Sequence, residues 1–93
     1  MVNIKSGARV YQMQKKDERT LKIESYAPLV KRIALHLKAR LPASVELDDL
    51  IQSGMIGLMD AVAHFEDGHG ASFETYATIR IRGSMLDEMR SND

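Results

Sequence analysis

The amino-acid sequence predicts an all-α fold, a compact bundle of three principal helices without a β-sheet. Over three stretches, apolar residues recur at three- and four-residue steps, which is the spacing of an amphipathic helix. Proline and glycine residues separate these stretches and mark the turns between them. The length of 93 residues is enough for one small domain but not for a second.

The first predicted helix runs from Asp17 to about Arg40. Residues 1–16 show no sustained period, and we expect them to form a mobile N-terminal lead to a helical domain over 17–93. Pro28 lies inside the helical pattern and lacks a backbone N–H, so we expect a kink or a restart near residues 25–27. Leu41-Pro42 ends the helix. Its apolar positions are Leu21, Ile23, Tyr26, Leu29, Val30, Ile33, Ala34, Leu37 and Leu41.

The second predicted helix begins at Asp48 and reaches His64 or Phe65. The Asp48 carboxylate can accept hydrogen bonds from the free N–H groups of the first turn, and Asp49 suits the positive end of the helix dipole. One face is predicted to enter the core: Leu50, Ile51, Gly54, Leu58, Ala61, Val62 and Phe65. The opposite face mixes polar and apolar residues: Asp49, Gln52, Ser53, Ile56, Met59, Asp60 and Ala63, with Met55 at the border.

The third predicted helix follows a turn at residues 66–70, which contains two glycines. Ser72 is placed to cap the helix, which runs from Phe73 to about Arg90. Its predicted buried side consists of Ala77, Thr78, Ile81, Met85 and Met89. A second face carries Tyr76, Ile79, Arg80, Gly83, Asp87 and Arg90.

The composition argues against several classes of protein. Without cysteine, the chain can form neither a disulfide scaffold nor a thiolate metal site, and it suits a reducing compartment. No run approaches the roughly 18 to 20 apolar residues that a membrane span needs, and the N-terminus lacks the apolar region of a signal peptide. We therefore expect a cytoplasmic protein with no membrane partner.

The net charge of zero hides blocks of opposite sign. Residues 1–40 carry ten Lys and Arg against three acids, residues 41–70 carry six acids and no Lys or Arg, and residues 71–93 carry three arginines against four acids. Such a chain can offer different surfaces to different partners, although solvated helix faces would give the same blocks.

Catalysis has little support in the residues. The sequence contains none of the motifs of a nucleophile elbow, a P-loop or a zinc protease, so we expect no enzyme, no cofactor and no metal site. His64 and His69 lie on either side of the turn without the spacing of helical metal ligands, and we interpret them as solvated loop residues.

Two faces have the composition of binding surfaces. Ile56 and Met59 lie among polar residues on the second helix, like an interface core with a polar rim, although ordinary half-exposed residues of a small domain would look the same. The third helix combines the aromatic residues Phe73 and Tyr76 with Arg80, Arg82 and Arg90. Aromatic rings stack bases and guanidinium groups hold phosphates on single-strand platforms, but these rings could equally belong to the core.

The segment from Tyr26 to Asp93 resembles the promoter-melting domain of bacterial RNA polymerase sigma factors. The resemblance rests on LPASVELDDLIQ, on the DLIQ-x-G-x-IGLM pattern at residues 49–59, and on FETYATIRIRG, while RIRGSMLDEMRS resembles the flagellar type. It implies a transcription initiation factor whose second helix docks on the coiled coil of the largest polymerase subunit. The matching docking positions are Asp49, Gln52, Ser53, Met55 and Met59, and the helical wheel adds Ile56.

The same resemblance implies that the third helix opens the promoter −10 element and captures bases of the non-template strand. Phe73, Thr75, Tyr76 and Thr78 occupy the matching positions, and Ile79 and Arg80 replace the tryptophan pair of primary members. Gly83, Leu86, Asp87 and Arg90 occupy the part that reads duplex DNA. A flagellar anti-sigma factor is a further implied partner. The downstream domains of full members are expected to be absent, so the chain would be a fragment.

Two other functions stay open at this point. The chain could be a stand-alone helical adaptor that binds only protein, or a nonspecific nucleic-acid binder driven by its basic first helix. We expect the sigma-type function to place Tyr76, Arg80 and Arg90 on one exposed side and Asp49, Gln52 and Met59 on another.

Overall fold

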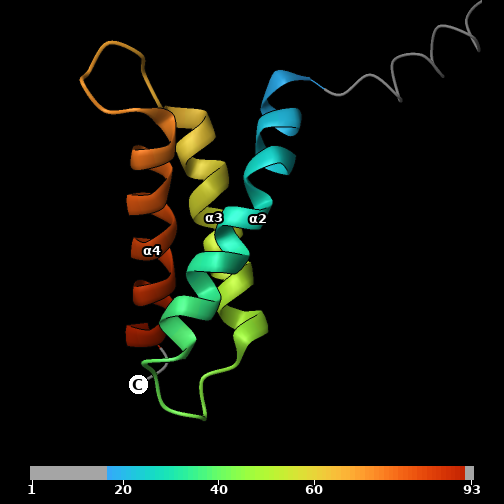
Figure 1. Ribbon diagram of the computed structural model, residues 1–93, viewed down its shortest axis with the longest axis vertical. Helices are drawn as coiled ribbons and strands as arrows, with labels where there is room; N and C mark the ends of the chain where they lie inside the picture. Colours follow the sequence, from blue (N-terminus) through green and yellow to red (C-terminus); the bar gives the residue numbers. More distant parts are fainter. Residues whose placement is uncertain (1–16, 92–93) are drawn as a thin grey trace, which may run out of the picture.

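The computed structural model describes residues 17–91, which form three α-helices: α2 (Glu18–Lys38), α3 (Leu47–His64) and α4 (Phe73–Ser91) (Figure 1). No strand occurs within these residues, so the predicted all-α bundle is confirmed. The predicted lead, residues 1–16, lies outside the described residues. None of the described helices has the length and apolar character to cross a membrane.

Helix α2 begins at a side-chain cap. The Thr20 N–H donates to Asp17 Oδ1 at 2.8 Å, and this hydrogen bond to the ionised carboxylate lowers the pKa of Asp17. The helix continues through Pro28 without a restart, and Figure 1 shows its course changing direction partway along. It ends at Lys38, two residues before the predicted end, because the Arg40 and Leu41 N–H groups bond to carbonyls only three residues back.

The start of α3 differs from the prediction. The helix begins at Leu47 and the capping position is Glu46, whose side chain makes no capping hydrogen bond. The predicted cap, Asp48, was wrong by two residues because Leu47 packs against the core and already belongs to the helix. Asp48 and Asp49 still lie in the first turn, where their charges suit the helix dipole.

The turn between α3 and α4 follows the prediction. Gly68 and Gly70 have φ values of +90° and +89°, a region that residues with a Cβ rarely adopt. The Ser72 hydroxyl accepts from the Thr75 N–H at 3.2 Å, which confirms the predicted cap of α4.

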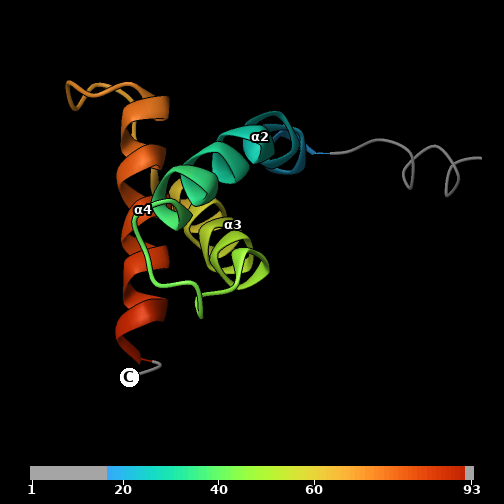
Figure 2. The ribbon, with the colours of Figure 1, turned by 60° about the horizontal axis from the view of Figure 1, so that its bottom comes forward.

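Helices α3 and α4 run side by side, and α2 packs across them (Figures 1 and 2). The buried hydrophobic core contains Leu29, Val30, Ile33, Ala34, Leu50, Leu58, Ala61, Phe73, Ala77, Ile81 and Met85. Of the face predicted to be buried in α3, Ile51, Val62 and Phe65 are only half-buried. In the predicted buried side of α4, Thr78 and Met89 are half-buried.

Helices α3 and α4 approach each other closely at Gly57, which the sequence analysis did not single out. A Cβ on Gly57 would lie 2.7 Å from the Arg80 carbonyl oxygen and 2.9 Å from Ile81 Cα. Ser53, one turn earlier, is only 8% exposed, so its predicted place on the open face of α3 was wrong. The small residues at 53 and 57 let α4 close over this side of α3.

Candidate functional site

Most of the predicted docking residues form an open surface on α3. Ile56 is 61% exposed and Met59 is 48% exposed, and Asp49 and Gln52 are exposed beside them. Met55 is half-buried and packs against the core. The open surface therefore consists of Asp49, Gln52, Ile56 and Met59, with Ser53 beneath it.

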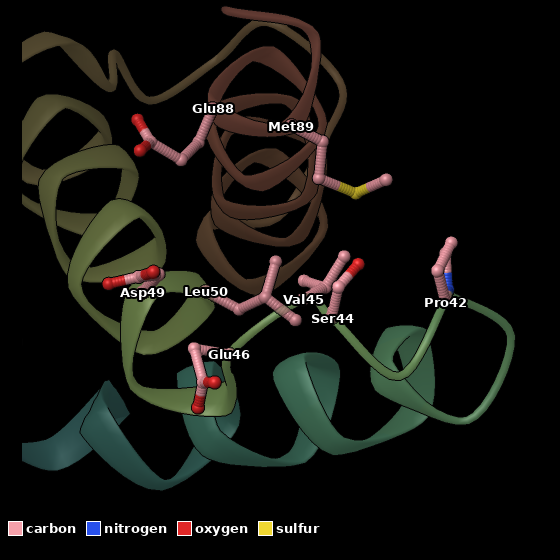
Figure 3. Close-up of a pocket in the computed structure, with 8 residues that line it drawn as sticks. All are labelled: Pro42, Ser44, Val45, Glu46, Asp49, Leu50, Glu88 and Met89. Carbon is pink, nitrogen blue, oxygen red and sulfur yellow. The ribbon is translucent and has the colours of Figure 1, made fainter. Parts of the chain in front are cut away.

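At the N-terminal end of α3 this surface borders a pocket of about 300 Å³ (Figure 3). Asp49, Glu46 and Glu88 place carboxylates around it, while Leu50 and Met89 supply apolar walls. Glu88 comes from the far end of α4, so only the tertiary fold brings it beside Asp49. Sequence reasoning missed Glu46 and Glu88, since neither lies on the α3 face that it considered.

Arg80 and Asp60 form an ion pair that connects α3 with α4. Arg80 Nε donates to Asp60 Oδ2 at 2.7 Å, and Arg80 Nη2 donates to the same oxygen. The other oxygen, Asp60 Oδ1, lies 3.0 Å from His64 Nδ1. The predicted DNA-binding Arg80 is therefore engaged by an acid of the neighbouring helix, which reduces its attraction for phosphate.

Part of the predicted α3 face and part of the predicted α4 face adjoin each other. Ser53, Ile56, Ser84 and Asp87 line one shallow hollow between α3 and α4. Ile79, Arg80 and Gly83 line a second hollow that shares Ser84 and Asp87 with the first. Ile79 is 65% exposed, and a Cβ on Gly83 would meet no atom within 4 Å. Of the six residues expected on exposed sides, Tyr76 is half-buried, and the others are exposed: Arg80, Arg90, Asp49, Gln52 and Met59.

The aromatic residues lie at the other end of the bundle. Phe73 is 8% exposed, and its ring packs edge-on against Tyr26 at 4.9 Å and Phe65 at 5.4 Å between centroids. Lys22 Nζ lies 3.9 Å from the centroid of the same ring. Of the two alternatives left open for Phe73, a ring for stacking or a ring of the core, its burial favours the core.

Tyr76 lies at the rim of a pocket that the sequence analysis missed. The tyrosine is half-buried, its ring is 5.6 Å from that of Phe65, and both rings line a pocket of about 260 Å³. His64, Glu66, His69 and Ala71 complete the lining. A largely apolar hollow lined by two aromatic rings offers ring surface against which a flat aromatic group such as a base can pack.

The remaining predicted residues of α4 differ in environment. The Thr75 hydroxyl accepts from Ser72 Oγ at 3.0 Å, while the half-buried Thr78 hydroxyl donates to the Glu74 carbonyl oxygen at 2.8 Å. Arg90 lies 3.6 Å from Asp87, and both are exposed. His64 and His69 are exposed, as predicted, although His64 is the last residue of α3 and does not belong to the loop. The described residues contain no cluster of metal-binding side chains.

Comparison with known proteins identifies the family. Residues 23–93 match the family described as Sigma-70 region 2. The chain belongs to this family. The RNA polymerase sigma factor FliA of Pseudomonas aeruginosa is 58% identical over 89 residues, which cover 95% of this chain and 36% of that protein. FliA of Escherichia coli K12 is 59% identical over 70 residues, which cover 75% of this chain and 29% of that protein.

The solved Sigma-28(FliA)/FlgM complex has the same fold. Its match covers 80% of this chain and 32% of that chain, with a TM-score of 0.74 and 42% sequence identity. The chain thus spans about a third of the length of the relatives that it matches.

Proposed function

We propose that this chain acts as the region of a flagellar-type sigma factor that docks on RNA polymerase core and binds and melts the promoter −10 element. The observation that carries the proposal is the open face of α3, where Ile56 and Met59 are exposed within a chain of the Sigma-70 region 2 family. Exposed apolar residues with a polar rim are the usual composition of a docking surface.

The second half of the proposal concerns α4. Exposed Ile79, the open Gly83 and the pocket beside Tyr76 supply an apolar wedge, room for a close approach and a place for an unstacked base. Extruding a base costs a few kcal/mol. Asp60 and Asp87 form ion pairs with Arg80 and Arg90, so binding of DNA by the free chain should be weak. The polymerase should supply the remaining binding energy.

The partners follow from the relatives. We propose RNA polymerase core and promoter DNA as the main partners, in the cytoplasm, where transcription takes place in bacteria. An anti-sigma protein of the FlgM kind is a third proposed partner, because a relative with 42% sequence identity was solved in complex with FlgM. A protein-only adaptor stays the alternative, and the pairing of Arg80 with Asp60 is the observation that favours it.

The docking half is tested by substituting residues of the open α3 face. Gln52→Ala and Met59→Ala should each weaken binding to polymerase core by about 1 to 2 kcal/mol, as loss of an interface residue does. The melting temperature should hardly change, because both side chains are exposed. Fluorescence anisotropy with labelled chain and purified core measures the affinity, and circular dichroism measures the melting temperature.

Leu58→Ala is the matched control, since Leu58 is fully buried next to Met59. It should lower the melting temperature strongly through lost burial and a residual cavity. If Met59→Ala leaves the affinity for RNA polymerase core unchanged, the docking assignment is wrong. The complex of chain and RNA polymerase core should bind a −10 non-template oligonucleotide more tightly than polymerase core alone does. If it does not, the adaptor function describes the chain better.

A further inference from the structure

The sulfur atoms of this chain all belong to methionine, because the sequence has six methionines and no cysteine. Four of these methionines lie among residues 17–91, in different environments. Met85 is fully buried in the core, and Met55 and Met89 are half-buried against it. Met59 is 48% exposed, more than any other methionine of the described residues. The fold therefore presents one of these four thioethers to solvent and shields the others.

Met59 also lies on the proposed docking surface. It follows Ile56 by one turn on the open face of α3, and these two are the large apolar side chains that α3 exposes. The core of an interface consists mainly of apolar side chains that lose their water when the partners meet. The side chain of Ile56 is an unreactive hydrocarbon, whereas the thioether of Met59 can be converted into a polar group.

Peroxides carry out this conversion by a two-electron oxidation. The thioether sulfur attacks one oxygen of hydrogen peroxide, and an S–O bond forms while the O–O bond breaks. The proton on the attacked oxygen passes to the departing oxygen, which leaves as water. The sulfur loses two electrons and the peroxide gains them, so the flexible apolar side chain becomes a polar, chiral sulfoxide. Because peroxide must reach the sulfur, Met59 should react before the fully buried Met85.

We propose that Met59 is an oxidation site that controls docking, and that its conversion to methionine sulfoxide weakens the binding of the chain to RNA polymerase core. This proposal rests on the proposed function, in which the open face of α3 docks on core. In the free chain the sulfoxide oxygen stays in water, whereas a docked interface removes that water, so the cost falls on the docked state. The fold should tolerate the change because Met59 is exposed, and methionine sulfoxide reductases reverse it.

Oxidation of the chain before it meets the polymerase provides the test. The chain is treated with hydrogen peroxide, the peroxide is removed with catalase, and the chain is titrated into untreated core. The affinity for core should fall by about tenfold, the equivalent of losing one interface residue, while the melting temperature hardly changes. Fragment-ion mass spectrometry should show a gain of oxygen at Met59 before any gain at Met55 or Met85. Methionine sulfoxide reductase should restore both the mass and the affinity.

Two leucine variants assign the effect to a side chain. Met59→Leu keeps an apolar side chain of similar volume that peroxide cannot oxidise. Its affinity for core, whatever the starting value, should be the same before and after peroxide treatment. Met89→Leu removes a half-buried sulfur of α4 instead, so this variant should lose affinity on treatment as the wild-type chain does.

The outcomes separate this proposal from the proposed function. If the untreated wild-type chain does not bind core, the docking function and the oxidation site are both wrong. If the untreated chain binds core and the chain oxidised at Met59 binds equally well, docking stands and the oxidation site alone is wrong. The assignment to Met59 also falls if peroxide-treated Met59→Leu loses as much affinity as treated wild type. A matching fall in the melting temperature would mean that peroxide damages the core of the fold, and this result overturns the proposal as well.

Discussion

The ion pair between Asp60 and Arg80 joins two helices whose outer faces have different proposed partners. Both residues are partly exposed, and pairs of this kind contribute between zero and about 1 kcal/mol to stability. The larger effect concerns binding, because the Asp60 carboxylate and a phosphate would compete for the same guanidinium donors. Asp60 should therefore oppose nucleic-acid binding by the free chain.

Replacing Asp60 tests this competition directly. Asp60→Asn keeps the shape of the side chain but removes its charge, so Arg80 should become available to phosphate. The affinity of the free chain for a single-stranded oligonucleotide should rise by about two- to fivefold, the equivalent of a surface ion pair. Anisotropy titrations at low salt measure the change.

Asp67→Asn serves as the control for net charge, because Asp67 lies in the exposed turn and has no ion-pair partner among residues 17–91. It should raise the affinity much less than Asp60→Asn does. Equal gains from both variants would show that the total charge matters and the Asp60–Arg80 pair does not. In the double variant Asp60→Asn/Arg80→Ala the gain should disappear.

At the scale of the helices, Gly57 of α3 and Gly83 of α4 have opposite environments. Gly57 faces the backbone of α4, and a Cβ there would lie 2.7 Å from the Arg80 carbonyl oxygen. Gly83 lies on α4 with no atom within 4 Å of the position of a Cβ. The first glycine is needed for packing within the chain, and the second is not.

Alanine substitutions should therefore have opposite effects at these positions. Gly57→Ala should destabilise the chain by about 1 to 3 kcal/mol, because α3 and α4 must move apart. Gly83→Ala should stabilise it by about 0.5 to 1 kcal/mol, since alanine loses less backbone entropy in a helix. Chemical unfolding followed by circular dichroism gives both values.

The Gly83 variant also tests the proposed DNA-binding face of α4. If a strand of DNA approaches the α4 backbone closely, the added methyl group should weaken oligonucleotide binding in the polymerase complex while the chain itself becomes more stable. A stabilised variant with unchanged DNA affinity would mean that no close approach occurs at Gly83.

For the molecule as a whole, all proposed surfaces depend on one small core. Leu58 from α3 and Ile81 and Met85 from α4 are fully buried, and Phe73 links the core to α2 through Tyr26. Small domains have only about 5 to 15 kcal/mol of total stability, and a chain of this length should lie toward the lower end. A single core substitution can therefore affect docking and DNA binding together.

Ile81→Ala is the clearest case, because its side chain is fully buried between the helices. The free energy of unfolding should fall by about 2 to 5 kcal/mol, because apolar burial is lost and a cavity remains. The apparent affinities for RNA polymerase core and for the oligonucleotide should then fall by the same factor as the fraction of folded chain. A selective loss of only one affinity, with an unchanged melting temperature, would mean that Ile81 acts at an interface.

Local sequence signals determined the helices, the turn and most of the core. Apolar spacing predicted the three helices, and Leu50, Leu58 and Ile81 are buried as predicted. Ser72 caps α4, and the two turn glycines adopt positive φ values. Such signals act within a few residues, which is why a single chain reveals them. Asp48 was misplaced as a cap because the packing of Leu47 overrides a local preference.

The tertiary structure alone decided which side chains share a surface. A helical wheel treats each helix separately, so it could not foresee that α4 covers Ser53, that Phe73 is enclosed by two rings, or that Asp60 engages Arg80. It also could not foresee that Arg32 of α2 and Arg82 of α4, 50 positions apart in the sequence, line the same groove. Periodicity specifies the direction of a side chain within its own helix, whereas burial and charge pairing depend on what the neighbouring helix presents to it.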